Sequence, residues 1–154
     1  MITYLKGDAT KPQDLHQGKP MIISHIVNNV GAWGKGFVLA LSKRWKEPET
    51  FYKSLYKGYT LGSTMFVSVE TNIIVANMIA QNNIISKTGI DNPPIDYKAL
   101  ETCLKEVCVK AKLMKASVHM PKIGSGLAGG EWDKIEKIIE DIFVDVKVYT
   151  YIFN

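Results

Sequence analysis

Cysteine is scarce in this 154-residue sequence, and long apolar runs are absent. The two cysteines, Cys103 and Cys108, fall five positions apart in a segment with helical periodicity. That spacing separates their Cα atoms by about 8 Å, too far for an unstrained disulfide, and two cysteines make no zinc site. No run reaches the roughly 18 apolar residues of a membrane span, and residues 1–6 lack the pattern of a signal peptide. We therefore expect free, buried thiols in a cytoplasmic protein that has no metal ligand set, cofactor or membrane contact.

Charge of one sign is not concentrated anywhere along the sequence. Lys and Arg number 19 against 15 Asp and Glu, a formal net charge of +4, and the two signs are interspersed, as in residues 134–137. Interspersed charge is typical of a solvated surface, so nucleic-acid binding is a distant alternative. A mildly positive field would also suit a small polyanionic ligand. The length and the 46% hydrophobic content predict one domain over residues 1–154.

Strand and helix patterns alternate along the chain. Strands are predicted over residues 2–6, 21–27, 64–70, 72–79, 117–123 and 146–153. Helices are predicted over residues 37–45, 49–56, 95–114 and 132–143. Pro48 is expected to break the first helix, and Pro93-Pro94 to open the longest one. This alternation predicts an α/β fold with a mixed, about six-stranded sheet covered on both faces, and with ligands bound in loops at strand ends.

Residues 28–36, here called the first loop, join a buried strand to a predicted helix. Glycines at such a turn let backbone N–H groups approach an anion, and the helix N-terminus adds a favourable dipole. Its candidate ligand-binding residues are Asn28, Asn29, Gly31, Trp33, Gly34, Lys35 and Gly36. Trp33 would offer a stacking or lid surface. For this loop alone, a plain turn in which the glycines only provide positive φ is an equally good interpretation.

Residues 123–130, here called the second loop, contain the full pattern G-x-G-x-x-G between a predicted strand and a predicted helix. In a dinucleotide-binding fold this pattern opens the first βαβ unit, whereas here it occupies the last one. We therefore favour one compact site, in which two glycine loops hold one diphosphate from two sides. The candidate residues of this loop are Gly124, Ser125, Gly126, Leu127 and Ala128.

Polar residues at the ends of two further strands have competing interpretations. Asp8 follows the first strand, where its carboxylate could accept a hydrogen bond from an exocyclic amine such as that of adenine, or could stabilise a turn. Asn77 and Gln81 share one face of the fourth strand by its period of two. Their side chains would either reach the ligand or satisfy backbone groups at the strand end.

The three histidines differ in their expected surroundings. His25 lies inside the strand over residues 21–27, where it is a candidate acid or base, or a structural hydrogen-bond partner. His16 lies in a polar loop and is expected at the surface. His119 lies in a buried strand and is expected to be a core histidine with satisfied hydrogen bonds.

Together these segments resemble the macrodomain family over essentially the whole chain. Gly7-Asp8-Ala9-Thr10 resembles the G-D-I-T motif of macrodomains, residues 25–36 resemble their first ligand loop, and residues 121–127 resemble their phosphate loop. The closing residues 148–150 also fit. Within the family, the chain is similar to the branch of yeast-type ADP-ribose-1''-phosphate phosphatases and terminal ADP-ribose glycohydrolases. The resemblance implies a three-layer α/β/α fold and, as partners, ADP-ribose, ADP-ribose-1''-phosphate or ADP-ribosylated macromolecules.

The resemblance also implies roles by position. It assigns contacts with adenine to Asp8, Ala9 and Tyr149. It assigns contacts with the distal ribose and the diphosphate to Gly34, Lys35, Gly36 and the backbone amides of residues 124–127. The candidate catalytic residues of a phosphatase are His25, Asn28 and Lys35.

Three positions depart from the hydrolases of this family. The glycohydrolase branch uses a lysine at the end of the fourth strand as nucleophile, where this chain has Ile79-Ala80-Gln81. It also places an aspartate after the phosphate loop, where this chain has Ala128, and another branch carries an aspartate near the position of Lys35. These departures disfavour glycohydrolase chemistry by known routes. Two alternatives remain compatible with these departures. One is a phosphatase, in which Lys35 and the loop amides stabilise the charge of the phosphoryl group, and the other is a binding module without turnover.

Overall fold

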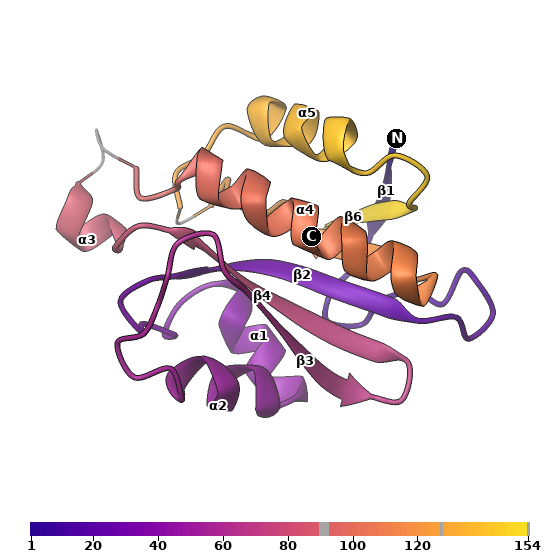
Figure 1. Ribbon diagram of the computed structural model, residues 1–154, viewed down its shortest axis with the longest axis horizontal. Coiled ribbons are helices and arrows are strands. Elements are labelled where there is room, and N and C mark those ends of the chain that lie inside the picture. The colour runs from indigo at the N-terminus through magenta and orange to yellow at the C-terminus, as the bar shows by residue number, and fades with distance from the viewer. Residues whose placement is uncertain (90–92, 127, 154) are drawn as a thin grey trace.

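Six strands form one mixed sheet in the computed structural model, which describes residues 1–89, 93–126 and 128–153 (Figure 1). The strands are β1 (Ile2–Lys6), β2 (Met21–Asn28), β3 (Thr64–Glu70), β4 (Ile73–Gln81), β5 (Ser117–Pro121) and β6 (Val148–Ile152). They lie in the order β1-β6-β5-β2-β4-β3, and every neighbouring pair is parallel except β3 with β4. The predicted mixed sheet is thus confirmed. Its central strand β2 is buried along almost its whole length, which explains the continuous apolar run there.

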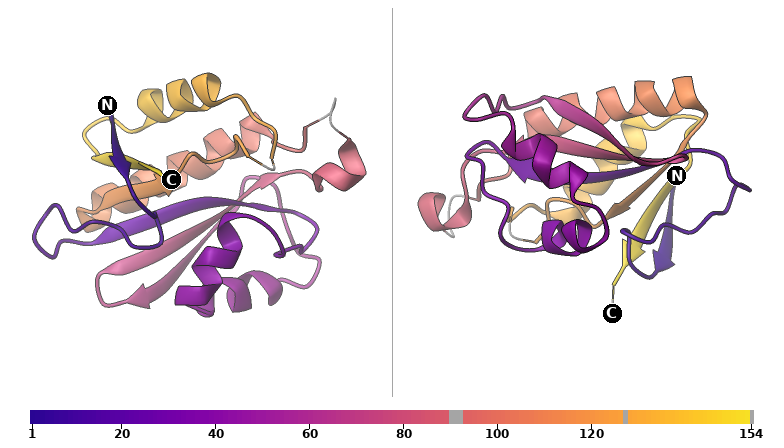
Figure 2. Two further views of the ribbon diagram at one scale, coloured as in Figure 1. Left: turned by 180° about the vertical axis from the view of Figure 1, so that it is seen from behind. Right: turned by 90° about the horizontal axis from the view of Figure 1, so that it is seen from below.

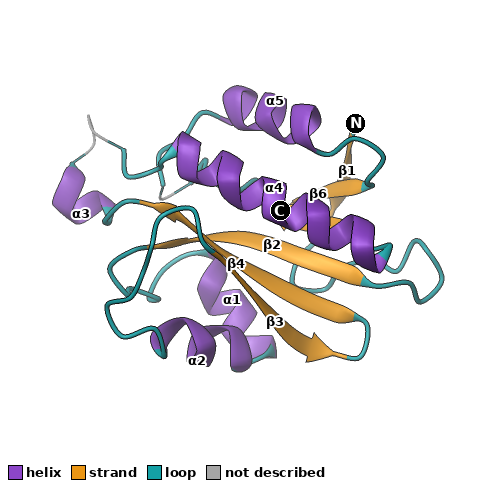
Figure 3. Ribbon diagram, in the orientation of Figure 1, coloured by secondary structure: helices purple, strands orange, loops and turns teal. Residues whose placement is uncertain are grey.

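Helices cover both faces of the sheet and give the predicted three-layer arrangement (Figure 3). Helices α1 (Phe37–Arg44) and α2 (Glu47–Lys53) cover one face, and α4 (Tyr97–Met114) and α5 (Trp132–Ile142) cover the other (Figure 2). A short helix, α3 (Ile85–Thr88), follows β4 and projects at one end of the molecule. Within the described residues, no helix has both the length and the apolar character needed to cross a membrane.

The observed helix boundaries differ from the predicted ones for local reasons. Pro48 lies in the first turn of α2, where the missing proline N–H would have had no partner within the helix. The helix therefore includes Pro48 and spans Glu47–Lys53, instead of the predicted residues 49–56. Helix α4 begins only at Tyr97, because the Asp96 carboxylate accepts a hydrogen bond from Ala99 N–H at 2.9 Å and caps it there. Helix α3 has four residues, too few for a periodic apolar pattern, so the sequence predicts only a loop at this place.

The buried polar side chains largely follow expectation. Cys103 and Cys108 are free and buried. His119 is a core histidine with no exposed surface, and its two ring nitrogens bond the Ser117 hydroxyl and the Tyr151 hydroxyl, each at 2.8 Å. His16 is half-buried rather than a free surface residue, because its Nε2 bonds the Tyr149 hydroxyl at 2.7 Å.

The chain changes sides of the sheet where β2 and β5 end. It leaves β2 toward α1 on one face, and it leaves the neighbouring β5 toward α5 on the other face (Figure 2). In open parallel sheets, such a divergence opens a crevice outside the carboxyl ends of the strands, where ligands bind. The two glycine loops, distant in the sequence, meet at this point.

Candidate functional site

A cavity of about 520 Å³ lies between the two glycine loops, at the carboxyl ends of β2 and β5. Its wall also includes the start of α1, the end of β4 and the short helix α3. The predicted site residues that line it are His25, Asn28, Gly34, Lys35, Gly36, Gln81, Gly124, Gly126 and Ala128. The fold therefore brings together both loops that the sequence singled out.

Other predicted site residues lie outside the cavity lining. These residues are Asp8, Ala9, Asn29, Gly31, Trp33, Asn77, Ser125 and Tyr149. Leu127 lies outside the described residues. Their assignment to a ligand stays a prediction, and the structure shows what most of them contact within the protein.

Asn28 and Tyr52 fix the shape of the first loop. The Asn28 side-chain oxygen accepts hydrogen bonds from Val30 N–H at 3.0 Å and Ala32 N–H at 3.1 Å, and its amide donates to the Ala32 carbonyl at 2.7 Å. The Tyr52 hydroxyl donates to the Asn28 carbonyl at 2.6 Å and accepts from Gly31 N–H at 3.1 Å. The Asn28 side chain is thus engaged with the backbone of its own loop, which makes it a positioning residue.

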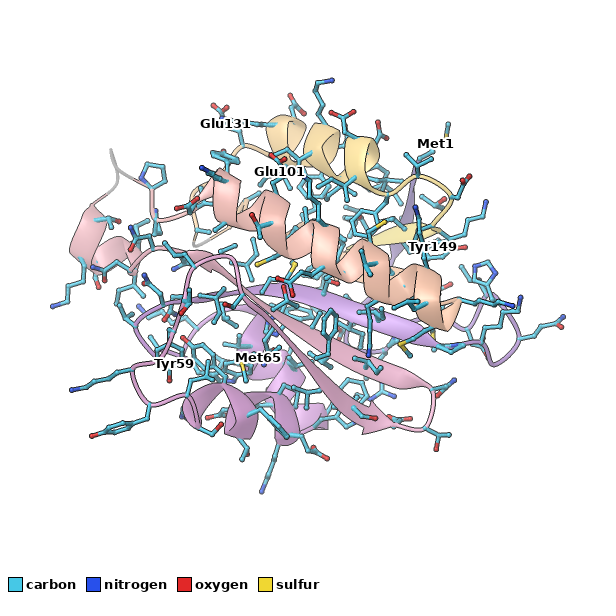
Figure 4. All side chains as sticks on the ribbon, in the orientation of Figure 1. Met1, Tyr59, Met65, Glu101, Glu131 and Tyr149 are labelled. Carbon is cyan, nitrogen blue, oxygen red and sulfur yellow. The ribbon has the colours of Figure 1, made fainter. Side chains whose placement is uncertain are left out.

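Tyr52 is a residue of the site that sequence reasoning missed. It lies in α2, is fully buried, and gives no local signal that its hydroxyl reaches a distant loop. Burial raises the pKa of Tyr52, so the hydroxyl keeps the proton that it donates. Tyr59 packs against the Tyr52 ring with centroids 4.7 Å apart, on the side of the sheet covered by α1 and α2 (Figure 4). Gly31 lies beside Tyr59 with φ +80°, where a Cβ atom would approach the Tyr59 ring to 3.1 Å.

Trp33 is buried and does not form the predicted stacking or lid surface. Its Nε1–H donates to the Ser42 hydroxyl at 2.8 Å, and Ser42 in turn donates to Glu49 at 2.9 Å. The ring packs beside His25 and Tyr52, with centroid distances of 5.6 and 5.3 Å. Because α1 supplies a partner for the indole N–H inside the core, the whole ring can be buried there. Trp33 therefore anchors the first loop to the core beneath α1 and α2.

His25 lines the cavity with its proton fixed on one nitrogen. Its Nε2 bonds the Asn77 side-chain oxygen, and the Asn77 amide donates to the Pro48 carbonyl at 3.0 Å. Since Asn77 presents its oxygen, His25 must donate, and the proton lies on Nε2. Nδ1 is buried and has no hydrogen-bond partner among the described residues. Burial lowers the pKa of His25 to about 4, so the ring is neutral at pH 7 and is an acceptor rather than an acid.

Asn29 ties the first loop to the segment before α3. Its amide donates to the Asn82 side chain at 3.1 Å, and its side-chain oxygen accepts from Asn83 N–H at 2.7 Å. Gln81 donates to the Asn83 carbonyl at 3.1 Å. These bonds hold residues 84–86 on the cavity wall, a contribution that the sequence analysis did not include because it predicts only a loop there.

Glycine is required where the second loop turns. Gly124 has φ +74°, and a Cβ atom there would lie 2.6 Å from the Ile95 Cδ1 atom. Gly126 lines the cavity, and a Cβ atom there would meet nothing within 4 Å. The Ser125 hydroxyl donates to the Lys122 carbonyl at 2.8 Å, within the loop's own turn. At Gly124 and Gly126, backbone therefore forms the wall of the cavity.

The Asp8 carboxylate is engaged in its own turn. One of its oxygens accepts hydrogen bonds from the N–H and the hydroxyl of Thr10, at 2.8 and 2.7 Å. Ala9 packs with Tyr149 in a small buried cluster that Phe37 also contacts. Phe37 in turn lines the cavity. Ala9 and Tyr149, two of the residues predicted to contact adenine, therefore adjoin the cavity through Phe37.

Positive charge dominates the cavity. Lys35 and Lys122 line it, and neither forms an ion pair with an acid in the described part of the chain. No Asp or Glu is found among the described lining residues. The described ranges also contain no group of three His, Cys, Asp or Glu residues placed to hold a metal. Lysines and loop amides without a nearby carboxylate suit an anionic ligand such as a phosphate.

Comparison with known proteins gives a consistent likeness. No protein-family model matches the sequence. The crystal structure of a Bacteroides thetaiotaomicron protein is 49% identical, with a TM-score of 0.90 over 98% of this chain and 99% of that one. A macrodomain protein from Streptomyces coelicolor is 38% identical, with a TM-score of 0.85 over 100% of both chains.

Two more distant matches carry ligand or activity names. An ADP-ribose 1''-phosphate phosphatase of Candida albicans is 26% identical over 146 residues, which are 92% of this chain and 93% of that protein. Thermosipho africanus DarTG, solved in complex with ADP-ribose, is 17% identical with a TM-score of 0.72 over 99% of this chain and 41% of that one. At that identity the likeness is one of fold alone.

Proposed function

Since this chain belongs to the macrodomain family, we propose that it binds ADP-ribose between its two glycine loops and releases phosphate from ADP-ribose-1''-phosphate. The observation that carries the proposal is a cavity walled by both loops, with Lys35 and Lys122 on its lining and no carboxylate among the described lining residues. Two comparisons support it, because a relative of similar fold is seen with ADP-ribose and a relative of similar sequence is named for this phosphatase activity.

The proposed binding mode follows from the loop geometry. A cavity of about 520 Å³ falls within the range of roughly 300–1,000 Å³ that is usual for small-molecule sites. The diphosphate would lie between the backbone amides of the first and second loops, close to the N-terminus of α1. Adenine would extend past Phe37 toward Asp8, Ala9 and Tyr149, and the distal ribose would lie near Lys35.

Phosphate release would depend on charge stabilisation. Water attacks the phosphorus, the bond from phosphorus to the ribose oxygen breaks, and ADP-ribose and inorganic phosphate leave. Lys35 and Lys122 would stabilise the charge on the phosphoryl oxygens during this step. His25 would act as a neutral residue of the cavity wall, because its Nε2 proton is held by Asn77 and its Nδ1 is buried.

A binding module without turnover is the second candidate, and two observations favour it. Gln81 and Ala128 line the cavity at the positions where the resemblance leads us to expect the lysine and aspartate of glycohydrolases. Asn28 is also engaged within its own loop. Under this alternative the protein recognises ADP-ribose and forms no product.

Two measurements in sequence separate these candidates. Calorimetric titration with ADP-ribose should give a Kd of about 1 μM, near −8 kcal/mol. A phosphate-release assay on ADP-ribose-1''-phosphate should then show turnover that falls at least about tenfold in Lys35→Ala. Lys43→Ala, at an exposed position of α1 outside the cavity lining, is the matched control and should retain full activity. Binding without release would support the binding module, and no heat with ADP-ribose would overturn both candidates.

A further inference from the structure

A second hollow, of about 430 Å³, lies at the opposite end of the sheet from the ADP-ribose cavity. Lys19, Lys112, Lys115 and Lys147 line it, and they come from the segment before β2, the end of α4 and the segment before β6. In Figure 1 this is the end of the molecule where α4 finishes, away from α3. Lysines that are interspersed with acids along the sequence therefore gather at one place on the surface.

Backbone hydrogen bonds fix these segments to one another. Ser117 N–H, at the start of β5, donates to the Pro20 carbonyl at 3.1 Å and so holds the neighbouring Lys19 beside β5. Val118 N–H donates to the Lys147 carbonyl at 2.9 Å. At the end of α4, Ala116 N–H donates to the Ala111 carbonyl at 2.8 Å and brings the last turn of the helix against the same strand. The positions of the lysines are thus set by ordered backbone.

The hollow carries an excess of positive charge. Asp145 is the acidic residue among its described lining, and none of the four lysines forms an ion pair with an acid in the part of the chain that the structure describes. The C-terminus of α4 adds only about half a negative charge. Four lysines therefore line the hollow with one aspartate and the partial charge of a helix end, and the balance of charge favours an anion.

We propose that this hollow is a separate anion site that binds the phosphate groups of a multiply charged ligand, either a free polyphosphate or nucleotide, or the backbone of a nucleic acid. Lysine is a point-charge donor that suits phosphate oxygens, whereas planar bidentate recognition of carboxylates is typical of arginine, which does not line the described hollow. His16 also lines it, but its Nε2 already bonds Tyr149. The site depends on none of the residues of the ADP-ribose cavity.

A matched pair of triple variants tests this site. Lys19→Gln, Lys112→Gln and Lys147→Gln together remove three of its charges, while Lys115 is left unchanged because its φ of +57° restricts the residues that fit there. The control carries Lys43→Gln, Lys46→Gln and Lys98→Gln, which remove the same charge from exposed positions outside the lining of the hollow. Circular dichroism and thermal unfolding verify that both variants fold.

The probes are sodium tripolyphosphate, titrated by calorimetry, and a fluorescein-labelled duplex DNA of about 20 base pairs, followed by anisotropy at several salt concentrations. We expect the hollow variant to lose about tenfold or more in affinity for at least one probe, and the control to stay within about twofold of the unmodified protein. For DNA, removing three phosphate contacts should also make the slope of log K against log salt shallower by about 2.7.

The two arms identify the source of the phosphate. A loss for tripolyphosphate alone indicates a free phosphorylated ligand, and a loss for DNA with the shallower slope indicates a nucleic acid. Equal losses in the hollow variant and the control would show a general charge effect and overturn the site. Lack of binding of both probes at about 50 mM salt would overturn it as well.

Discussion

The Tyr52 hydroxyl gives a sharp test of how the first loop is held in place. Tyr52→Phe removes one oxygen and keeps the ring, which packs against Trp33 at 5.3 Å and Tyr59 at 4.7 Å between centroids. The variant therefore isolates the hydrogen bonds of the hydroxyl, which donates to the Asn28 carbonyl at 2.6 Å and to the Asn28 side-chain oxygen at 2.8 Å, and accepts from Gly31 N–H at 3.1 Å.

The expected loss follows from the backbone groups left without a partner. An unsatisfied buried polar group costs about 1–3 kcal/mol, and Gly31 is half-buried, so water can replace part of its bond. We therefore expect the free energy of unfolding to fall by about 1–3 kcal/mol in total. Tyr52 does not line the cavity, but the loop that it holds does. Affinity for ADP-ribose should accordingly fall about three- to tenfold, since part of the binding energy must then reorder the loop.

Urea unfolding measures the first quantity, and calorimetric titration with ADP-ribose measures the second. Tyr59→Phe is the control, because Tyr59 lies on the same stack and its hydroxyl has no hydrogen bond with a described residue. It should leave both quantities close to those of the unmodified protein. Equal losses in the two variants, or full stability of Tyr52→Phe, would show that ring packing holds the loop and that our reasoning is wrong.

Three further predictions concern the core and the loops. Burial lowers the pKa of His25 and His119 to about 4, below the ordinary value of 6.5, so the unfolded state binds more protons between these pH values. The free energy of unfolding from urea titrations should therefore fall as pH decreases from 6.5 toward 4, by up to about 1.4 kcal/mol per pH unit for each histidine. His119→Gln should halve this dependence on pH. An unchanged dependence in that variant would contradict the burial argument. Gly124→Ala should lower the free energy of unfolding by about 1–3 kcal/mol and weaken ADP-ribose binding, whereas Gly126→Ala, where a Cβ atom would meet no protein atom within 4 Å, should leave the free energy of unfolding nearly unchanged. Asp8→Ala should reduce the preference for ADP-ribose over diphosphates without adenine in competition titrations, and equal preference would remove Asp8 from adenine recognition.

Features that depend on one segment could be predicted from the sequence. The apolar run of β2 indicates a strand buried on both faces, and it is one. The G-x-G-x-x-G pattern between a strand and a helix places the second loop at a strand end, where Gly124 and Gly126 line the cavity. The apolar residues that recur every four positions over residues 95–111 likewise predict the buried face of α4.

Features that join distant segments could not be predicted in this way. Nothing in the sequence pattern around Tyr52 indicates that its hydroxyl reaches Asn28. Nothing around Ser42 indicates that its hydroxyl accepts the hydrogen bond of the buried Trp33 indole N–H. In both cases the partner is supplied by the packing of a helix against a loop. The gathering of Lys19 with Lys147 has the same cause, because backbone pairing with β5 brings both residues to one end of the sheet.

The state of His25 leads to a last prediction about any phosphatase activity in the cavity. Its Nε2 proton is held by Asn77, and its pKa of about 4 keeps the ring neutral over the range of ordinary assays. His25 therefore cannot supply an ionisation between pH 5.5 and 8, whereas the second ionisation of a phosphate monoester has a pKa near 6 and belongs to the substrate. The pH profile of phosphate release should accordingly have the same shape in the unmodified protein and in His25→Gln, even if the rates differ. A limb of the profile near pH 6.5 that disappears in His25→Gln would show that His25 titrates during turnover, and the neutral state assigned to it would be wrong.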